Sequence, residues 1–266
     1  MFEPSDFAFS SSEAVQRLAD GLARQPLPVY LERLPVNSPT LAALRQAYKG
    51  RGKVLLSPAM PTPTLRLEAR DQDVDAWFNA GRRSDFRRAE RLAAGFGQVG
   101  FDMHAPKTEG ELVPLLAEAF DMEAKSWKAA AGTALTADPV QGDFFARFTA
   151  AAVEENMLRL AFMRIDGKAV AMQIACEWQR RFWLFKISHD QAFARCSPGQ
   201  LLMRHTLRYA TESGLRSYEF MGVMADWTRS WTHEVRDYVQ VRAIPFSGAA
   251  LKMLAKSSVR AVLRRF

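Results

Sequence analysis

The sequence contains little cysteine and little histidine. Two cysteines, Cys176 and Cys196, occur in 266 residues, and their separation suits neither a disulfide framework nor a zinc site. The four histidines show no metal-ligand spacing. The sequence therefore predicts reduced thiols and no bound metal. Cys176 lies in an apolar run that is typical of a core, whereas Cys196 lies in a turn, where both a reactive thiol and an incidental one are open interpretations.

Long apolar runs are also missing. Although 48% of the residues are hydrophobic, there is no stretch of about 18 apolar residues, the length that a membrane-spanning helix requires. Residues 1–12 lack the basic and then apolar layout of a signal peptide. We therefore expect a globular protein with a sizeable core and a cytoplasmic location.

Acidic residues are fewer than basic ones. The 29 Asp and Glu residues against 36 Lys and Arg residues give a net charge of +7, which predicts a surface that attracts anions. Arginines cluster in residues 82–91, and lysines and arginines recur every four residues in residues 247–266. The second segment resembles a basic amphipathic helix, for which peripheral membrane contact and packing on the domain are two interpretations. No DNA partner is expected.

The N-terminal part, residues 1–70, alternates short helices and strands that are separated by prolines. Two of its expected strands are separate segments, residues 53–57 and 64–67. Residues 71–96 then read as a helix, with acidic residues at its beginning, glycines at its end and Gly81 as a candidate break.

From residue 98 onward the signals are a strand, two helices, three antiparallel strands, a helix and further short strands. Asp166-Gly167 is the strongest hairpin signal in the chain. This order predicts an α/β (α+β) fold, in which helices flank a mixed, mainly antiparallel sheet. The expected parts are residues 1–70, 71–246 and 247–266.

An exposed turn between a strand and a helix carries the main functional signal. Ser197 is expected to cap the helix, and Pro198 suits its first position. The main-chain amides of Gly199, Gln200 and Leu201 would then face outward and attract an anion such as a phosphate. An ordinary capped helix is the alternative interpretation.

Several motifs around this turn share one order along the chain. They are Glu-Ala-Lys-Ser-Trp-Lys at 123–128, the Asp166-Gly167 hairpin, the run 186–202 with Ser-Pro-Gly-Gln-Leu-Leu, Tyr-Glu-Phe-Met-Gly at 218–222 and Trp-Thr-Arg-Ser-Trp at 227–231. Together they resemble the GNAT acyltransferase superfamily, in particular its branch related to cellulose-biosynthesis acetyltransferases and Fem-type aminoacyltransferases. The resemblance covers residues 82–245. Residues 1–70 resemble the second half of another such domain, a partial second lobe.

The resemblance implies acetyl-CoA or another acyl-CoA as the acyl donor. The donor's diphosphate would bind at the beginning of the helix, at Ser197, Gly199, Gln200, Leu201 and Leu202. Its pantetheine arm would lie beside the strand edge of Lys186, Ile187 and Ser188. The acceptor would be a small-molecule amine, an amino sugar or a cell-envelope precursor.

Acyl transfer to an amine needs a group that removes a proton from the amine. Glu219, in the strand beside the donor, is the first candidate, and Asp190 and Asp226 are the others. Tyr218 precedes Glu219 in a strand and must point to the opposite face. Two tryptophan-containing segments supply candidates for the acceptor site: Trp127 with Lys128, and Trp227 with Trp231. Lys128 and Lys186 are also candidates to neutralise an acidic acceptor or the donor phosphates.

Two other functions remain open from the sequence. A Fem-type transferase would take its acyl group from aminoacyl-tRNA and would bind RNA phosphates through the arginines of residues 82–91. A non-catalytic module would keep the fold and bind a ligand or partner without turnover. The sequence does not indicate the oligomeric state.

Overall fold

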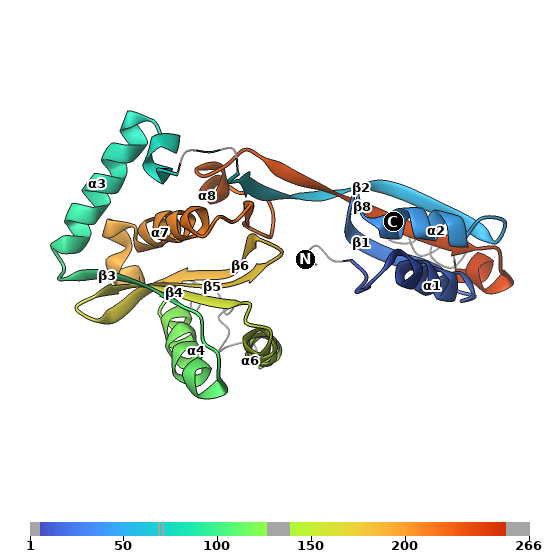
Figure 1. Ribbon diagram of the computed structural model, residues 1–266, viewed down its shortest axis with the longest axis horizontal. Helices are drawn as coiled ribbons and strands as arrows, with labels where there is room; N and C mark the ends of the chain where they lie inside the picture. The colour runs from blue at the N-terminus through green and yellow to red at the C-terminus, as the bar shows by residue number, and fades with distance from the viewer. Residues whose placement is uncertain (1–5, 69, 71, 127–138, 254–266) are drawn as a thin grey trace, which may run out of the picture. The chain divides into compact units, whose positions relative to one another are not determined.

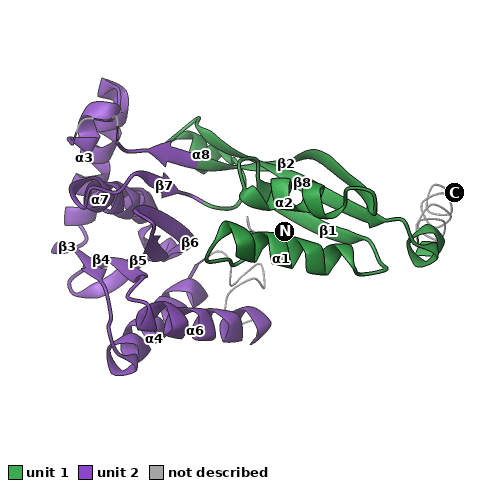
Figure 2. Cartoon of the chain, turned by 45° about the vertical axis from the view of Figure 1, so that its right-hand side comes forward, with its two compact units in different colours: residues 1–63, 221–266 green, residues 64–220 purple. Residues whose placement is uncertain are grey.

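The computed structural model describes residues 6–68, 70, 72–126 and 139–253. It divides the chain into two compact units, which Figure 2 colours separately. Unit 1 consists of residues 1–63 and 221–266, and unit 2 consists of residues 64–220. The described strands are β1 Val29–Pro35, β2 Gly52–Arg66, β3 Val99–His104, β4 Leu158–Ile165, β5 Lys168–Trp178, β6 Arg181–His189, β7 Ser217–Glu219 and β8 Val235–Pro245.

The strands pair in the order β1-β8-β2-β7-β6-β5-β4-β3. The pairing is antiparallel except between β6 and β7, which are parallel. Helices flank the strands in both units (Figure 1). The predicted mixed, mainly antiparallel α/β fold is therefore confirmed.

Unit 2 is a three-layer structure. Helices α4 (Glu109–Ala124) and α6 (Pro139–Glu154) cover one face of its sheet, and α7 (Pro198–Glu212) covers the other (Figure 1). The apolar residues of β4 and β5 alternate between these two layers and form much of the core. The β4–β5 connection is the predicted hairpin turn, with Asp166 at φ 48° and Gly167 at φ 77°, as a type I′ turn requires.

The single helix predicted over residues 71–96 is wrong. A 3₁₀ turn, η1 (Val74–Trp77), comes first, and α3 (Ala80–Ala94) begins only after Asn79. Phe78 is extended, and the Asn79 side chain accepts a hydrogen bond from the Arg82 amide at 2.8 Å. Asn79 therefore caps a new helix at a point where the hydrophobic pattern alone suggests continuity.

In unit 1, α1 (Ser12–Ala23) and α2 (Pro39–Ala47) pack on β1, β8 and β2 around a core that includes Leu44 and Val241. The two strands predicted at residues 53–57 and 64–67 are one strand, β2, with a bulge between Ala59 and Thr62. Residues 52–63 of β2 form an edge of this unit's sheet, where prolines are tolerated because their missing amide can face away from the neighbouring strand.

The predicted partition at residue 246 differs from the observed one. Strand β8 pairs with both β1 and β2, so that Ala243 lies opposite Val29 on one side and Val54 on the other. The chain after residue 220 therefore belongs with the N-terminal residues. Residues 248–253 are helical, and the rest of the predicted C-terminal helix lies outside the described residues. Within the described part of the chain, no helix has both the length and the apolar character needed to cross a membrane.

Candidate functional site

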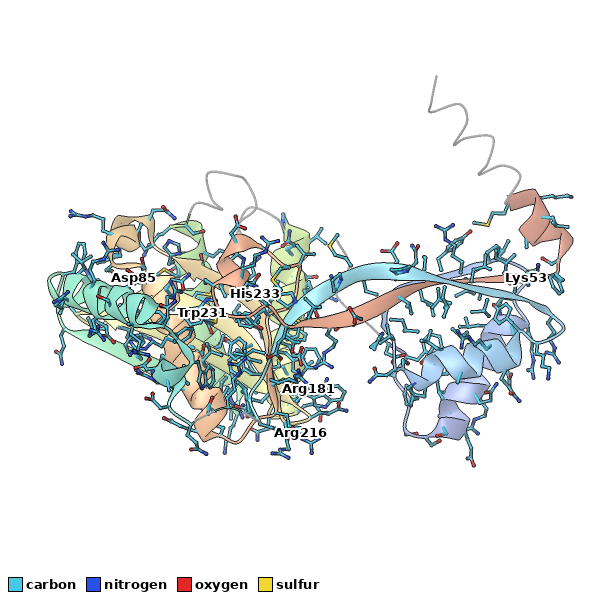
Figure 3. All side chains as sticks on the ribbon, turned by 90° about the horizontal axis from the view of Figure 1, so that it is seen from above. Lys53, Asp85, Arg181, Arg216, Trp231 and His233 are labelled. Carbon is cyan, nitrogen blue, oxygen red and sulfur yellow. The ribbon has the colours of Figure 1, made fainter. Side chains whose placement is uncertain are left out.

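Strands β6 and β7 begin side by side and then separate. Their parallel pairing runs from Arg181 opposite Ser217 to Trp183 opposite Glu219. Arg181 and Arg216, labelled in Figure 3, mark where the two strands begin. Strand β7 ends at Glu219, whereas β6 continues to His189. The described pairing of β6 with β7 therefore ends at the Trp183–Glu219 pair.

Glu219 faces the α4 and α6 side of the sheet. Its neighbour Tyr218 faces α7, because its ring stacks on Phe182 at 4.7 Å and its hydroxyl lies 3.0 Å from the Thr206 hydroxyl. Alternation along the strand then places Glu219 on the opposite face. The Glu219 side chain is buried, and the Ser217 hydroxyl donates a hydrogen bond to its Oε1 atom at 2.6 Å. The carboxylate is therefore held in a fixed orientation.

A bulge in β6 places Lys186 on this same face. The register with β5 shifts at Phe185, after which Lys186 lies opposite Ile174. The Lys186 ammonium is 3.1 Å from Glu123 Oε1 and 5.3 Å from the centre of the Phe145 ring. The Lys186 side chain is 12% exposed and that of Glu123 is 0% exposed. An ammonium neutralised inside the unit does not fit the predicted role in binding phosphates or an acidic acceptor.

The turn after β6 differs from the predicted cap. A 3₁₀ segment, η2 (Gln191–Cys196), precedes it, and Ser197 adopts the left-handed conformation at φ 48° with no hydrogen bond from its side chain to the helix. The Ser197 carbonyl accepts the amides of Gln200 at 2.9 Å and Leu201 at 3.2 Å. The prediction that Ser197 caps the helix through its side chain, leaving three free amides, is therefore wrong. Of those three amides, that of Gly199 is the one without an acceptor among the described residues.

Other predicted residues near the turn have structural roles. The Asp190 carboxylate caps η2 by accepting the Ala192 amide at 2.9 Å. The side chains of Leu201 and Leu202 are buried in the core of unit 2. These side chains therefore serve the local structure, Asp190 as a cap and the two leucines as core residues.

A basic cavity lies between α3 and this turn. It has a volume of about 170 Å³ and is lined by Arg82 and Arg88 from α3 and by Arg195, Ser197 and Gln200 from the turn. The Arg82 guanidinium donates a hydrogen bond to the Gln200 side chain at 2.6 Å. Asp85 also lines the cavity, and it lies 3.9 Å from Arg88. The cationic side chains outnumber the acidic one, so the cavity suits an anionic group such as a phosphate.

Ion pairs fix α3 beside α7. The Arg204 guanidinium, on α7, binds both carboxylate oxygens of Asp75 at 2.5 and 2.6 Å and Glu90 at 2.6 Å. Arg208 adds a contact to Asp75 at 2.6 Å. The hydrogen bonds from Arg204 lower the pKa of Asp75 below its usual value. The arginines of α3 are therefore held in place before any ligand binds.

A family model described as an acetyltransferase (GNAT) domain matches residues 80–229. The chain belongs to the GNAT family. The matched region begins at α3, so the helix that carries the basic cavity is part of this GNAT domain. The fold supports an acyltransferase. A search of curated proteins gives no match.

Solved structures with the same fold extend the comparison beyond the matched region. The C-terminal domain (DUF2156) of a putative lysylphosphatidylglycerol synthetase from Agrobacterium fabrum is similar with a TM-score of 0.59 at 12% identity, over 92% of this chain and 76% of that one. FemX gives 0.56 at 11% identity, over 87% and 77%. L-PGS from Bacillus licheniformis gives 0.54 at 10% identity, over 86% and 72%. Identities this low show a shared fold.

Several residues predicted for the GNAT site belong to unit 1. The side chain of Asp226 is 100% exposed and pairs with Arg229 at 2.7 Å. Trp231 is buried, whereas Trp227 is exposed, so the two tryptophans do not form the predicted open aromatic wall. Trp127 and Lys128 lie outside the described residues.

Neither cysteine is suited to nucleophilic chemistry in this GNAT domain. Burial raises the pKa of the Cys176 thiol to about 12. Burial also raises the pKa of Cys196, whose thiol donates to the Phe193 carbonyl. The described residues contain no group of three or more His, Cys, Asp or Glu side chains that could hold a metal ion.

The ion-pair partners of Lys186 and of α7 could not be predicted from the sequence. Glu123, Asp75 and Arg204 are ordinary charged residues of amphipathic helices in the sequence, and no local motif connects them with Lys186 or with α3. The arginines of residues 82–91 were singled out as a basic cluster, but Arg195 was not joined to them, because the two segments meet only through the fold.

Proposed function

We propose that this GNAT domain transfers an acyl group from acyl-CoA to an amine of a small molecule, an amino sugar or a cell-envelope precursor. The observation that carries the proposal is the basic cavity at the end of β6. That strand leads from the Trp183–Glu219 pair directly to the turn that lines the cavity. A donor with a phosphate-bearing end and a reactive end fits this path.

Side chains supply most of the positive charge for the donor phosphates. Arg82, Arg88 and Arg195 line the cavity, and Gly199 follows Ser197 and Pro198 at the beginning of α7. Arginine binds phosphate through paired hydrogen bonds. These hydrogen bonds replace those of the Gln200 and Leu201 amides, which donate to the Ser197 carbonyl instead. The diphosphate of coenzyme A is the group that we assign to this cavity.

Glu219 acts as the base in this proposal. The amine attacks the thioester carbonyl, a C–N bond forms and the C–S bond breaks. Glu219 accepts the proton that the amine loses, and the departing sulfur takes up a proton and leaves as a thiol. The hydrogen bond from Ser217 orients the carboxylate, and the closed surroundings protect it from competing water.

The test uses the full chain in two steps. Isothermal titration with acetyl-CoA measures donor binding, and mass spectrometry of a panel of amines incubated with acetyl-CoA detects transfer. We expect micromolar donor binding and at least one acylated amine. Absence of binding by acetyl-CoA and by longer acyl-CoA thioesters would contradict the proposal, and binding without transfer to any amine would favour the non-catalytic module.

The structural neighbours favour one second candidate. FemX, L-PGS and the C-terminal domain of the putative lysylphosphatidylglycerol synthetase share the fold over most of this chain. A Fem-type donor, aminoacyl-tRNA, would place RNA phosphates on the same α3 arginines. Transfer from aminoacyl-tRNA together with failure to bind acyl-CoA would establish this candidate.

A further inference from the structure

One end of unit 1 is formed by three segments that come from distant parts of the sequence. They are residues 24–28 between α1 and β1, residues 48–52 between α2 and β2, and residues 246–253 after β8. The Ser247 hydroxyl donates a hydrogen bond to the Pro26 carbonyl at 2.5 Å. The Phe246 amide donates to the Arg51 carbonyl at 2.7 Å. These contacts join the three segments into one surface, the end surface, which adjoins Lys53 at the beginning of β2 (Figure 3).

The charge of the end surface has one sign. The exposed cations of the three segments are Arg24, Lys49, Arg51 and Lys252. The same segments contain no Asp or Glu, and none occurs in residues 33–67 or 238–266. Beyond the described residues the sequence adds Lys256, Arg260, Arg264 and Arg265. Such a concentration of positive charge attracts a partner that carries many negative charges.

Large apolar side chains are exposed among these cations. Leu27 is 51% exposed, Phe246 is 65% exposed and Leu251 is 70% exposed. The sequence leaves two interpretations of residues 247–266, packing on the domain and contact with a membrane. Ala250 is buried and attaches the beginning of this segment to unit 1, but the Leu251 side chain next to it remains in water. The exposure of Leu251 favours contact with a partner.

The mixture of apolar and cationic side chains selects the class of partner. At a bilayer surface, leucine and phenylalanine enter the boundary between headgroups and acyl chains, while lysine and arginine attract anionic headgroups. A nucleic acid would bind the cations through its phosphates and would leave most of the apolar area in water. The end surface therefore fits an anionic lipid surface better than a nucleic acid.

We infer that the end surface of unit 1 docks on a membrane surface that contains anionic phospholipids. The cations supply the attraction, and Leu27, Phe246 and Leu251 supply the apolar contact. The inference goes beyond the proposed function and does not depend on it, because all three segments lie outside the matched GNAT region, residues 80–229.

Sedimentation of the full chain with lipid vesicles tests the inference. One set of vesicles is phosphatidylcholine alone, and the other contains equal parts of phosphatidylcholine and phosphatidylglycerol. We expect binding to the second set and weaker binding when salt is added, because salt screens the attraction. Lys252→Glu and Leu251→Ser should each lower the partition coefficient about tenfold, since one reverses a charge and the other removes apolar contact. Both side chains are exposed, so the melting temperature should not change.

Lys168→Glu and Val113→Ser are the matched controls in unit 2. Lys168 is exposed, and Val113 is 58% exposed. Both controls should bind vesicles like the unmodified protein. Equal binding to the two sets of vesicles, binding to neither, or equal losses in the controls would overturn the inference.

A parallel titration with single-stranded RNA tests the other class of partner. RNA binding without vesicle binding, lost in Lys252→Glu and kept in Leu251→Ser, would overturn the inference in favour of a nucleic acid. Titration of the same preparation with acetyl-CoA tests the proposed function separately, so that failure of either one leaves the other standing.

Discussion

Glu219, which is buried and accepts a hydrogen bond from Ser217, is the base in the proposed function. We expect Glu219→Gln to lower kcat about 100-fold or more, because a glutamine cannot accept the amine proton. The Kd of acetyl-CoA should stay within about twofold, since the proposed site of the donor phosphates is the cavity. Steady-state kinetics and titration of the same preparation measure both quantities.

Asp226→Asn is the control for that measurement. Asp226 is fully exposed and pairs with Arg229 in its own short helix, α8 (Asp226–Arg229). Its substitution should leave kcat unchanged. A Glu219→Gln variant as active as the unmodified protein would remove Glu219 from the mechanism.

The Lys186–Glu123 pair makes a prediction about stability. Lys186→Met leaves a buried carboxylate without its cation, which we expect to cost about 3–5 kcal/mol of the free energy of unfolding. The double variant Lys186→Met with Glu123→Leu should recover most of this loss, because neither charge of the pair remains. Denaturant unfolding of the two single variants and the double variant measures the coupling. Additive losses would show that the two side chains do not interact.

At the residue scale, the sequence predicts what depends on neighbours in the chain. The opposite orientations of Tyr218 and Glu219 follow from strand alternation alone. The Lys186–Glu123 pair joins residues 63 positions apart and has no local signature. At Ser197 a local signal exists but is misleading. Ser-Pro is typical of a helix cap, whereas the left-handed backbone of Ser197 is explained by the η2 segment that precedes it.

Helix α3 contributes cationic side chains both inside and outside the cavity. Arg87 and Arg88 are both exposed, but only Arg88 of the two lines the cavity. We expect Arg88→Glu to weaken acetyl-CoA binding at least tenfold and Arg87→Glu to weaken it less than threefold. Titration at one fixed salt concentration compares the two, and equal effects would show that general surface charge, rather than the cavity, attracts the donor.

The attachment of η1 to α7 predicts a pH dependence of stability. Because Arg204 lowers the pKa of Asp75 in the folded protein, the pair stabilises the fold above the unfolded pKa of about 3.8. That contribution is lost as the pH falls through the folded pKa. Asp75→Asn should lower the melting temperature at pH 7 by several degrees and lose less stability than the unmodified protein below pH 4. Parallel pH profiles of the two proteins would contradict this account.

Elements with local signals were predicted well, and elements set by distant pairing were not. The hairpin at Asp166-Gly167 has a local signal, and both residues have the positive φ angles that its turn requires. The continuity of β2 through its prolines depends on β8, which is more than a hundred residues away in the sequence. The hydrophobic periodicity of β2 cannot indicate which distant strand pairs with it.

For the whole molecule, the salt dependence of binding separates the two candidate donors. Acetyl-CoA presents few phosphates, so its Kd should rise less than about tenfold between 50 and 200 mM salt. An RNA donor with 6–10 phosphate contacts would lose about 10³–10⁵ in affinity over the same range. Tight binding of aminoacyl-tRNA with this steep dependence would favour the Fem-type candidate.

The division into units could not be predicted from the order of elements. The order of elements along the chain predicts a continuous domain over residues 71–246, because strands that are neighbours in the sequence are usually also neighbours in the sheet. The fold instead returns to its first strands at the end, because β8 supplies hydrogen bonds to both β1 and β2.

This return of the chain sets the order in which a ribosome can complete the two units. All of residues 64–220 leave the exit tunnel before residues 235–245, so the sheet of unit 1 cannot close until the whole of unit 2 has been synthesised. Until then β1 and β2 lack β8, the strand with which both pair. Because proline has no amide to donate, Pro58, Pro61 and Pro63 disfavour pairing of β2 with the wrong strand.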